Sequence, residues 1–197
     1  MIDPPLVFVD VDTQRDFLDP GGALFIAGSQ AIRPNLARLT EFACLQAIPI
    51  IATACDHSPD DEEFQSFPPH CLSGTSGQSR IDETAGDGLI LAVGETYKGQ
   101  TPPRLTLSKS KYDVFDRPDA ESVFKAYSQR GQAVFVVYGV ATDYCVKKVV
   151  EGLLGRGHRV ALVADAIRAV EPLNEPDVLT EFVRLGAVLT LTDAVCS

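Results

Sequence analysis

Four short segments of this sequence carry side chains that can act as nucleophile, base or metal ligand. They contain Asp12, the run Cys55-Asp56-His57, Lys109 and Cys145. Each follows an apolar run of the kind that forms a buried strand. In open parallel sheets, ligands bind beyond the carboxyl ends of the strands. The sequence therefore predicts one site at the carboxyl edge of a sheet.

Cys145 is the candidate nucleophile. Thr142 suits an N-cap, which would place Cys145 in the first turn of a helix. There the helix dipole and the unpaired N–H groups favour a thiolate, and the same N–H groups can stabilise an oxyanion. The alternative is a buried structural cysteine, since free cysteine is among the most frequently buried residue types.

A thiol nucleophile needs a base, and three residues at the same edge are candidates. His57 and His70 are two of them, and Asp12 is the third if burial raises the pKa of its carboxyl. Lys109 would stabilise the charged forms of an aspartate and a thiolate. The alternatives are that Asp12 caps the following loop and that Lys109 is an ordinary surface lysine.

Two of the three histidines lie in one long polar segment, Asp56–Gln100. The runs Cys55-Asp56-His57 and Pro68-Pro69-His70-Cys71 offer sulfur and nitrogen donors that suit a metal of borderline softness. The spacing fits no zinc-finger template. The alternative is a solvated acidic loop with capping histidines.

Apolar runs and helical patterns alternate along the chain. Strands are expected at Leu6–Val11, Ile48–Ala54, Leu89–Val93, Leu105–Ser108, Ala133–Val140, Val160–Ala164 and Ala187–Leu191. Helices are expected at Ala31–Ala47, Pro118–Gln129 (with Gly131 as its C-cap glycine), Thr142–Leu154 and Asp177–Leu185. This alternation predicts an α/β fold, a three-layer doubly wound sheet that is mainly parallel. No linker divides the chain, so residues 1–197 are expected to form a single domain.

The composition excludes several classes of protein. The 197 residues include 17 Lys+Arg and 27 Asp+Glu, a net charge of -10, which argues against a nucleic-acid surface. No apolar run approaches the ~18 residues of a membrane span. The five widely spaced cysteines do not resemble a disulfide framework, and the N-terminus lacks the pattern of a signal peptide. We therefore expect a protein of the reducing cytoplasm, with free thiols.

Three motifs resemble those of the isochorismatase-like cysteine hydrolases. They are Val11-Asp12-Thr13-Gln14-Arg15-Asp16-Phe17, Lys109-Ser110-Lys111-Tyr112-Asp113-Val114-Phe115 and Gly139-Val140-Ala141-Thr142-Asp143-Tyr144-Cys145-Val146. The run Pro68-Pro69-His70-Cys71, followed by Gly74-Thr75, is similar to the nicotinamidase branch of that family. The similarity implies a single isochorismatase-like hydrolase domain with the family's Rossmann-like fold.

The resemblance also implies a reaction and a catalytic triad. Cys145 would attack the amide carbonyl of nicotinamide, giving nicotinate and ammonia through a thioester. Asp12 would take the thiol proton and pass it to the leaving ammonia. Lys109, three residues before Tyr112 as in the family, would orient Asp12 and support the thiolate.

The same resemblance assigns the surroundings of the substrate. A cis peptide bond is implied between Val140 and Ala141, with the N–H groups of Ala141 and Cys145 forming an oxyanion hole. Phe17 and Phe67 match positions that pack against the pyridine ring.

A divalent metal is implied as well, and no organic cofactor. Its ligands would be Cys55, His57, Glu63 and His70, with Cys55 standing where the family has an aspartate. A thiolate there favours zinc, with manganese or iron as the other candidates. The alternative is a weakened or lost site. In the family the metal binds the pyridine nitrogen of nicotinamide. The replacement of the aspartate by Cys55 therefore counts against nicotinamide as the substrate, and it leaves the triad unchanged.

The expected partners are a small amide substrate and further copies of this chain in a homo-oligomer, with neither nucleic acid nor membrane. Two other functions stay open. The first is hydrolysis of another small amide, a ureido or carbamoyl compound, or a vinyl ether. The second is a metal-binding module without catalysis.

Overall fold

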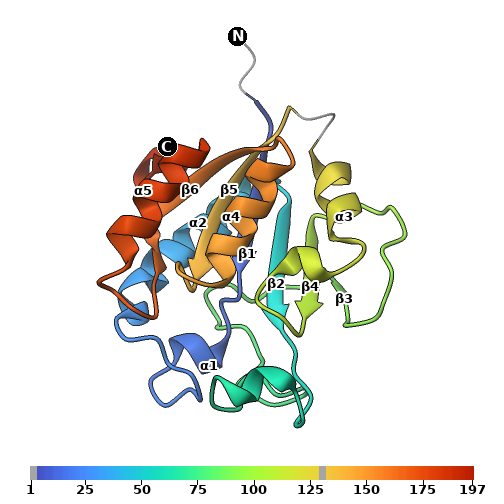
Figure 1. Ribbon diagram of the computed structural model, residues 1–197. Coiled ribbons are helices and arrows are strands. Elements are labelled where there is room, and N and C mark those ends of the chain that lie inside the picture. Colours follow the sequence, from blue (N-terminus) through green and yellow to red (C-terminus); the bar gives the residue numbers. More distant parts are fainter. Residues whose placement is uncertain (1–3, 129–131) are drawn as a thin grey trace.

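The computed structural model describes residues 4–128 and 132–197, and seven strands of that part form one parallel sheet (Figure 1). The strands are β1 (Leu6–Val11), β2 (Ile50–Cys55), β3 (Leu89–Leu91), β4 (Arg104–Lys109), β5 (Val134–Val140), β6 (Arg159–Arg168) and β7 (Val188–Thr190). Their order in the sheet is β3-β4-β2-β1-β5-β6-β7, and each neighbouring pair is parallel. The expected α/β fold is confirmed.

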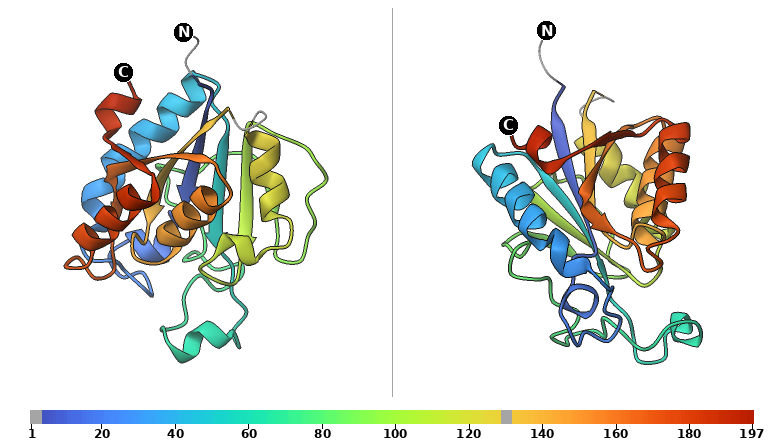
Figure 2. Two further views of the ribbon diagram at one scale, coloured as in Figure 1. Left: turned by 45° about the horizontal axis from the view of Figure 1, so that its top comes forward. Right: turned by 90° about the vertical axis from the view of Figure 1, so that its left-hand side faces the viewer.

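Helices cover both faces of the sheet (Figure 2). They are α1 (Arg15–Leu18), α2 (Arg33–Leu45), α3 (Ala120–Tyr127), α4 (Cys145–Gly155), α5 (Glu175–Leu185) and α6 (Thr192–Val195). The helices α3, α4 and α5 lie on one face, and α2 and α6 lie on the other. The three layers follow from strands that are apolar on both sides, so that each face must be covered. In β1, Phe8 packs in the core under α2, and Val7 and Val9 pack in the core under α4.

Several boundaries differ from those expected. The strand expected at Val160–Ala164 runs over Arg159–Arg168, and the helix expected at Thr142–Leu154 begins only at Cys145. Thr142 does not cap this helix, because its hydroxyl is 3.2 Å from a carboxylate oxygen of Glu175 on α5. Of the helix expected at Pro118–Gln129, the last residue and the expected cap Gly131 lie outside the described residues.

The long segment between β2 and β3 folds against the carboxyl edge of the sheet. Its one helical turn is the 3-10 helix Glu62–Gln65, and the short strand expected near its end is confirmed as β3. Arg80 fastens the segment, since its guanidinium pairs with the fully buried carboxylate of Asp10 on β1. Arg80 also donates to the carbonyl of Thr53 at 3.2 Å. Sequence reasoning missed this ion pair, whose partners are far apart in the chain.

Across residues 4–128 and 132–197, every helix is too short or too polar to cross a bilayer.

Candidate active site

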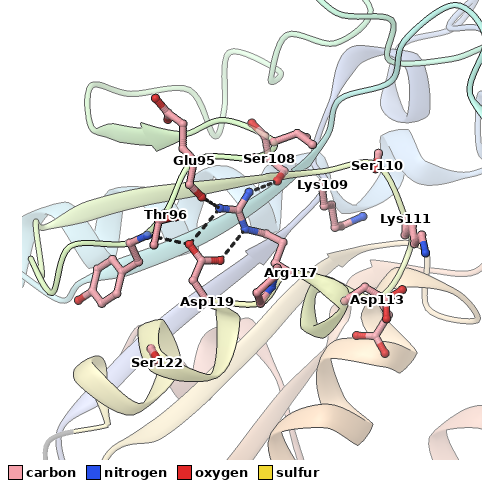
Figure 3. Close-up of a pocket in the computed structure, with 15 residues that line it drawn as sticks. Glu95, Thr96, Ser108, Lys109, Ser110, Lys111, Asp113, Arg117, Asp119 and Ser122 are labelled. Atoms are coloured by element: carbon pink, nitrogen blue, oxygen red, sulfur yellow. Dashed lines mark hydrogen bonds and ion pairs between the residues drawn. The ribbon is translucent and has the colours of Figure 1, made fainter.

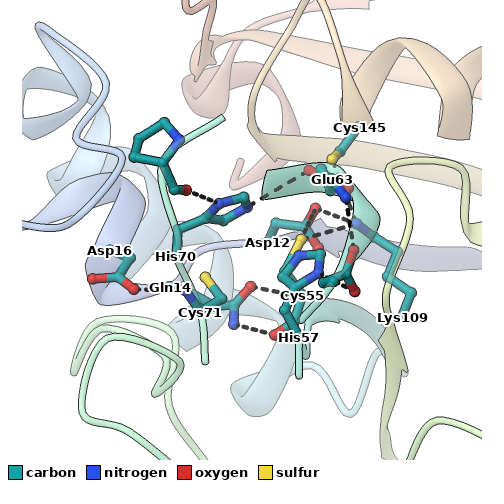
Figure 4. A network of polar contacts seen from close by, with 12 residues as sticks. Asp12, Gln14, Asp16, Cys55, His57, Glu63, His70, Cys71, Lys109 and Cys145 are labelled. Carbon is teal, nitrogen blue, oxygen red and sulfur yellow. Dashed lines mark hydrogen bonds and ion pairs between the residues drawn. The ribbon is translucent and has the colours of Figure 1, made fainter. Parts of the chain in front are cut away.

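Four neighbouring strands, β4, β2, β1 and β5, deliver the candidate residues to one place (Figure 4). Asp12 follows β1, Cys55 and Lys109 are the last residues of β2 and β4, and Cys145 opens α4 after β5. Asp12 has a φ of 48°, a left-handed conformation that aspartate tolerates better than most residues. The structure therefore brings together the residues for which the sequence predicts one site.

Asp12 and Lys109 form a buried ion pair at the centre of the site. Lys109 Nζ lies 2.8 Å from Asp12 Oδ2, and both side chains are almost completely excluded from solvent. The other carboxylate oxygen of Asp12 accepts a hydrogen bond of 2.6 Å from the Thr53 hydroxyl. Thr53 was not singled out from the sequence. The exposed Lys111, two residues from Lys109, has no such burial.

The same ammonium group contacts two sulfurs. Lys109 Nζ lies 3.3 Å from Cys55 Sγ and 3.4 Å from Cys145 Sγ. Cys55 Sγ is also 3.7 Å from Asp12 Oδ2. A single cation thus faces one carboxylate and two thiols, which lowers the cost of a negative charge on any of them.

Burial and mutual contact shift the pKa values of these groups. Burial, followed by the charge of Cys55, raises the pKa of Asp12 despite the opposing effect of Lys109. The pKa of Cys145 is raised by its contact with Cys55 and by burial. The contact with Cys145 and the Lys109 ammonium hold the pKa of Cys55 well below the ordinary value, in spite of burial. In this arrangement Asp12 has the raised pKa that a proton acceptor at neutral pH needs.

The backbone before Cys145 is shaped for close approach. The peptide bond Val140–Ala141 is cis, as the family resemblance implies. Gly139 has a φ of 114°, and a Cβ on it would lie 2.1 Å from the carbonyl oxygen of Val11. Among the described residues, the N–H groups of Ala141 and Cys145 donate none of the backbone hydrogen bonds found outside helices and strands. Both are therefore available to a ligand oxygen.

Three donor atoms for a metal converge beside this cluster. The ligand atoms of Cys55, His57 and His70, all buried, lie within 4.8 Å of one another. His57 Nδ1 is 3.0 Å from Asp61 Oδ2, and His70 Nδ1 is 2.9 Å from the carbonyl oxygen of Pro68. Because these contacts use the Nδ1 atoms, the Nε2 atom of each ring remains available to a metal. The buried Nε2 of His57 has no hydrogen-bond partner among the described residues. One sulfur and two imidazoles suit zinc, so the residues present fit a metal.

The fourth expected ligand, Glu63, lies at the edge of this set. One of its carboxylate oxygens is 3.6 Å from His70 Nε2, and burial raises the pKa of the carboxyl. Burial favours the neutral imidazole of His57, yet its contacts with Cys55 and Asp61 outweigh this and raise its pKa to about 9. His57 must therefore lose a proton before it can bind a metal at neutral pH.

A cavity of about 40 Å³ opens onto both sulfurs and is lined mainly by apolar side chains. Phe17 and Phe67 are in its wall, as are Ala141 and Cys145. The ring of Phe17 lies 5.4 Å from that of His70, so an aromatic wall joins the histidines to the cavity. Phe17 and Phe67 thus lie where a flat apolar ligand would contact them.

A larger cavity of about 430 Å³ has Lys109 among its lining residues (Figure 3). Its wall is built around Arg117, whose guanidinium pairs with Asp119 and donates to the carbonyl oxygens of Ser108, Ala92 and Glu95. The three carbonyl contacts tie the end of β4 to the loop that follows β3. Because the Arg117 guanidinium already makes these intramolecular contacts, it is not available to bind a ligand. The small cavity beside Cys145 is therefore the better candidate site.

Two residues of the first motif hold the site without entering it. The Gln14 side chain accepts from the N–H of Cys55 at 2.7 Å and donates to its carbonyl oxygen at 2.8 Å. Asp16 accepts from the N–H of Cys71 at 2.7 Å and so fixes the loop that carries His70. Sequence reasoning quoted both residues in a motif but gave them no role. The alternating spacing of Asp12, Gln14 and Asp16 was the available signal.

A model of the isochorismatase domain family matches residues 6–194 of the chain. The protein belongs to the isochorismatase family.

Several relatives of this isochorismatase-family protein carry the name nicotinamidase. The nicotinamidase of Escherichia coli (strain K12) is 27% identical over 212 residues, which cover 96% of this chain and 97% of that protein. A protein of Arabidopsis thaliana described as a probable inactive nicotinamidase is 25% identical over 167 residues, covering 82% and 80% of the two chains. The crystal structure of the Pyrococcus horikoshii pyrazinamidase in complex with zinc has a TM-score of 0.78 at 24% identity, with 95% and 99% of the chains covered. This last similarity shows a common fold.

Proposed function

We propose that the protein is a cysteine amidohydrolase that converts nicotinamide and water into nicotinate and ammonia, and that residues 1–197 act as one domain. The observation that carries the proposal is the contact of Lys109 with Asp12 and Cys145 beneath an apolar cavity. An acid, a cation and a thiol buried together are what acyl transfer to sulfur requires. Nicotinamidases among the relatives support the choice of substrate.

The proposed reaction has two halves that share one proton carrier. The Cys145 thiol passes its proton to Asp12, and the sulfur forms a bond to the carboxamide carbon. The tetrahedral oxyanion is stabilised by the free N–H groups of Ala141 and Cys145. Asp12 then gives the proton to the departing nitrogen, which leaves as ammonia with formation of a thioester.

Hydrolysis reverses the proton movement. Asp12 takes a proton from water, the hydroxyl adds to the thioester carbon, and the C–S bond breaks. Asp12 returns its proton to the departing Cys145 sulfur, and the acid product loses its own proton to solvent as nicotinate. Lys109 keeps its charge throughout and stabilises whichever neighbour is anionic, because its contact with Asp12 raises its own pKa well above the ordinary value despite burial.

The metal donors Cys55, His57 and His70 would position the substrate. A divalent metal bound there would supply a Lewis acid for the pyridine nitrogen of nicotinamide. Phe17 and Phe67 would contact the faces of the ring. The 40 Å³ cavity has room for about three waters by the usual measure, so a pyridine ring requires a lining side chain to move. Tyr112, 42% exposed, is the lining residue with the most freedom to do so.

Ammonia release from nicotinamide tests the proposal. The wild-type protein, with added zinc, manganese or iron, should release ammonia and nicotinate in equal amounts. Cys145→Ala should lose at least about a thousandfold in kcat, as expected for removal of a nucleophile. Cys196→Ala, at the partly exposed C-terminal end, is the matched control and should keep full activity. No ammonia from the wild type with any of the three metals would refute nicotinamide as the substrate.

A second candidate keeps the chemistry and changes the substrate to another small amide or a ureido compound. The observation in its favour is that the Cys55 sulfur contacts Lys109 at 3.3 Å, where the resemblance places a metal-binding aspartate. A panel of amides, carbamoyl compounds and vinyl ethers tests it with the same Cys145→Ala control. A homo-oligomer stays a prediction, to be measured by light scattering.

A further inference from the structure

The two thiols at the centre of the site share one environment. Cys55 and Cys145 both line the 40 Å³ cavity, and the ammonium of Lys109 contacts both sulfurs, at 3.3 and 3.4 Å. The sulfurs and a carboxylate oxygen of Asp12 lie within 4.8 Å of one another (Figure 4). The triad proposed above uses only one of these thiols, which leaves Cys55 as a second sulfur beside the nucleophile.

We propose that Cys55 and Cys145 form an oxidisable thiol pair, in which a hydroperoxide oxidises Cys145 and Cys55 then closes an intramolecular disulfide. The pair is a covalent modification site that blocks the nucleophile reversibly. It follows from the placement of the two sulfurs and holds whatever amide the protein hydrolyses.

The first step transfers one oxygen atom. The Cys145 sulfur attacks a peroxide oxygen, the O–O bond breaks, and the sulfur becomes a sulfenic acid. The proton that Asp12 has taken from the thiol goes to the departing hydroxide, so that the second product from hydrogen peroxide is water. The sulfur is oxidised by two electrons and the peroxide is reduced.

The second step forms the disulfide. The Cys55 sulfur attacks the sulfenic sulfur, the S–O bond breaks, and hydroxide leaves with the proton of the Cys55 thiol as a second water. Overall, two thiols and one hydrogen peroxide give one disulfide and two waters. The Lys109 ammonium, in contact with both sulfurs, stabilises the anionic sulfur that attacks in each step.

The placement of the sulfurs allows both steps. The cavity that both residues line has room for about three waters, enough for a hydrogen peroxide molecule. A disulfide needs the sulfurs at about 2.05 Å. Turning one side chain between staggered rotamers moves its sulfur by about 3 Å, which covers the gap from 4.8 Å at most.

The other cysteines are poorer partners. Cys71 is buried but, in the part of the chain that the structure describes, it lies outside the compact group of Asp12, Cys55 and Cys145. Cys44 is exposed and Cys196 partly exposed, so these two would give links between molecules. The proposal therefore predicts one specific pairing.

Disulfide mapping tests the pairing without any substrate. The purified full-length protein is treated with one equivalent of hydrogen peroxide, free thiols are alkylated, and the peptides are analysed by mass spectrometry. The expected result is a linked pair of peptides containing Cys55 and Cys145, an intact mass lower by two hydrogens, and restoration of both by dithiothreitol. A Cys55–Cys71 link, or links only between molecules, would overturn the proposal.

Variants give a second readout. In Cys55→Ser, treated like the wild type with excess hydrogen peroxide, the sulfenic acid has no partner. A second peroxide molecule should therefore oxidise Cys145 to the sulfinic acid, a gain of two oxygens that dithiothreitol does not reverse. Cys55→Ala serves the same purpose if the serine variant does not fold. Cys71→Ala is the matched control and should form the disulfide as the wild type does. Recovery of the Cys145 thiol in both Cys55 variants to the wild-type extent would also overturn the proposal.

Discussion

Replacement of Lys109 by methionine should make the stability of the protein depend strongly on pH. Methionine matches the length and apolar stem of lysine but removes the charge that faces Asp12 at 2.8 Å. Two unit charges at this distance interact by roughly 6 kcal/mol at an effective dielectric constant of about 20. Breaking a buried pair from one side costs about 3–5 kcal/mol, because a buried charge is left without a partner. We expect a loss of that size at pH 8.

The loss should be smaller at pH 5. In the wild type, burial raises the pKa of Asp12 while Lys109 lowers it, so removal of Lys109 raises that pKa further. A carboxyl with a native pKa above its unfolded value keeps its proton in the native state where the unfolded chain has lost it. Stability then falls as the pH rises from about 4 toward the native pKa, by up to about 1.4 kcal/mol per pH unit. The charge of Lys109 itself is constant across this range, since its pKa lies well above 10.5.

Urea unfolding at pH 5 and pH 8 measures the effect for wild type, Lys109→Met and the control Lys111→Met. Lys111 is exposed and two residues away, so its replacement should change the free energy of unfolding by less than about 0.5 kcal/mol at either pH. Equal losses for Lys109→Met at both pH values would refute the view that Asp12 and Lys109 form a buried ion pair. So would a control that loses as much as the variant.

Three further outcomes are expected. Since the pKa of His57 is about 9, one proton must leave before zinc binds, and zinc affinity should rise by about tenfold per pH unit between pH 7 and 9. Competition with a chelating dye measures this affinity, and an affinity that does not change with pH would contradict the role of His57 as a ligand. Arg80→Met leaves the buried carboxylate of Asp10 with the more distant Arg104 guanidinium, at 3.8 Å, and the Thr13 hydroxyl as partners, and it should lower the free energy of unfolding by about 1.5–3 kcal/mol in urea titrations. Gly139→Ala places a Cβ 2.1 Å from the carbonyl oxygen of Val11, so the variant should unfold at a clearly lower temperature in circular dichroism, and an unchanged melting temperature would contradict the described backbone.

The fold and the edge that carries the site could be predicted from local patterns. A run such as Leu6–Val11 must be buried on both faces, and the sequence shows where it ends, so Asp12 and Cys145 could be predicted to lie at the same edge of the sheet. The strand order that makes β1 and β5 neighbours comes from the structure. Contacts made by remote elements could not be predicted. Thr142 looked like a helix cap because its true partner, Glu175, lies on another helix.

The docking of the long segment between β2 and β3 shows the same limit. It depends on Arg80, which is 70 residues from its partner Asp10, and no periodicity links the two. A single arginine in a polar stretch is by itself the pattern of a solvated loop. The buried Asp10 at the end of this pairing, together with the contact of Asp16 with the N–H of Cys71, shows that the segment is fixed to the sheet and holds His57 and His70 in a defined place.

Cys55 lies between the two histidine donors and the pair Asp12 and Cys145, and hydrogen bonds hold its backbone in place. Gln14 holds both its N–H and its carbonyl oxygen, so a change of side chain at this position changes the chemistry without moving the chain. The sulfur that results is a donor beside His57 and also lies 3.3 Å from the ammonium of Lys109. A ligand or oxidant that engages this sulfur must therefore alter the charge around Cys145, which Lys109 contacts at nearly the same distance. In this chain the metal donors and the proposed triad form one electrostatic unit, and neither can be changed alone.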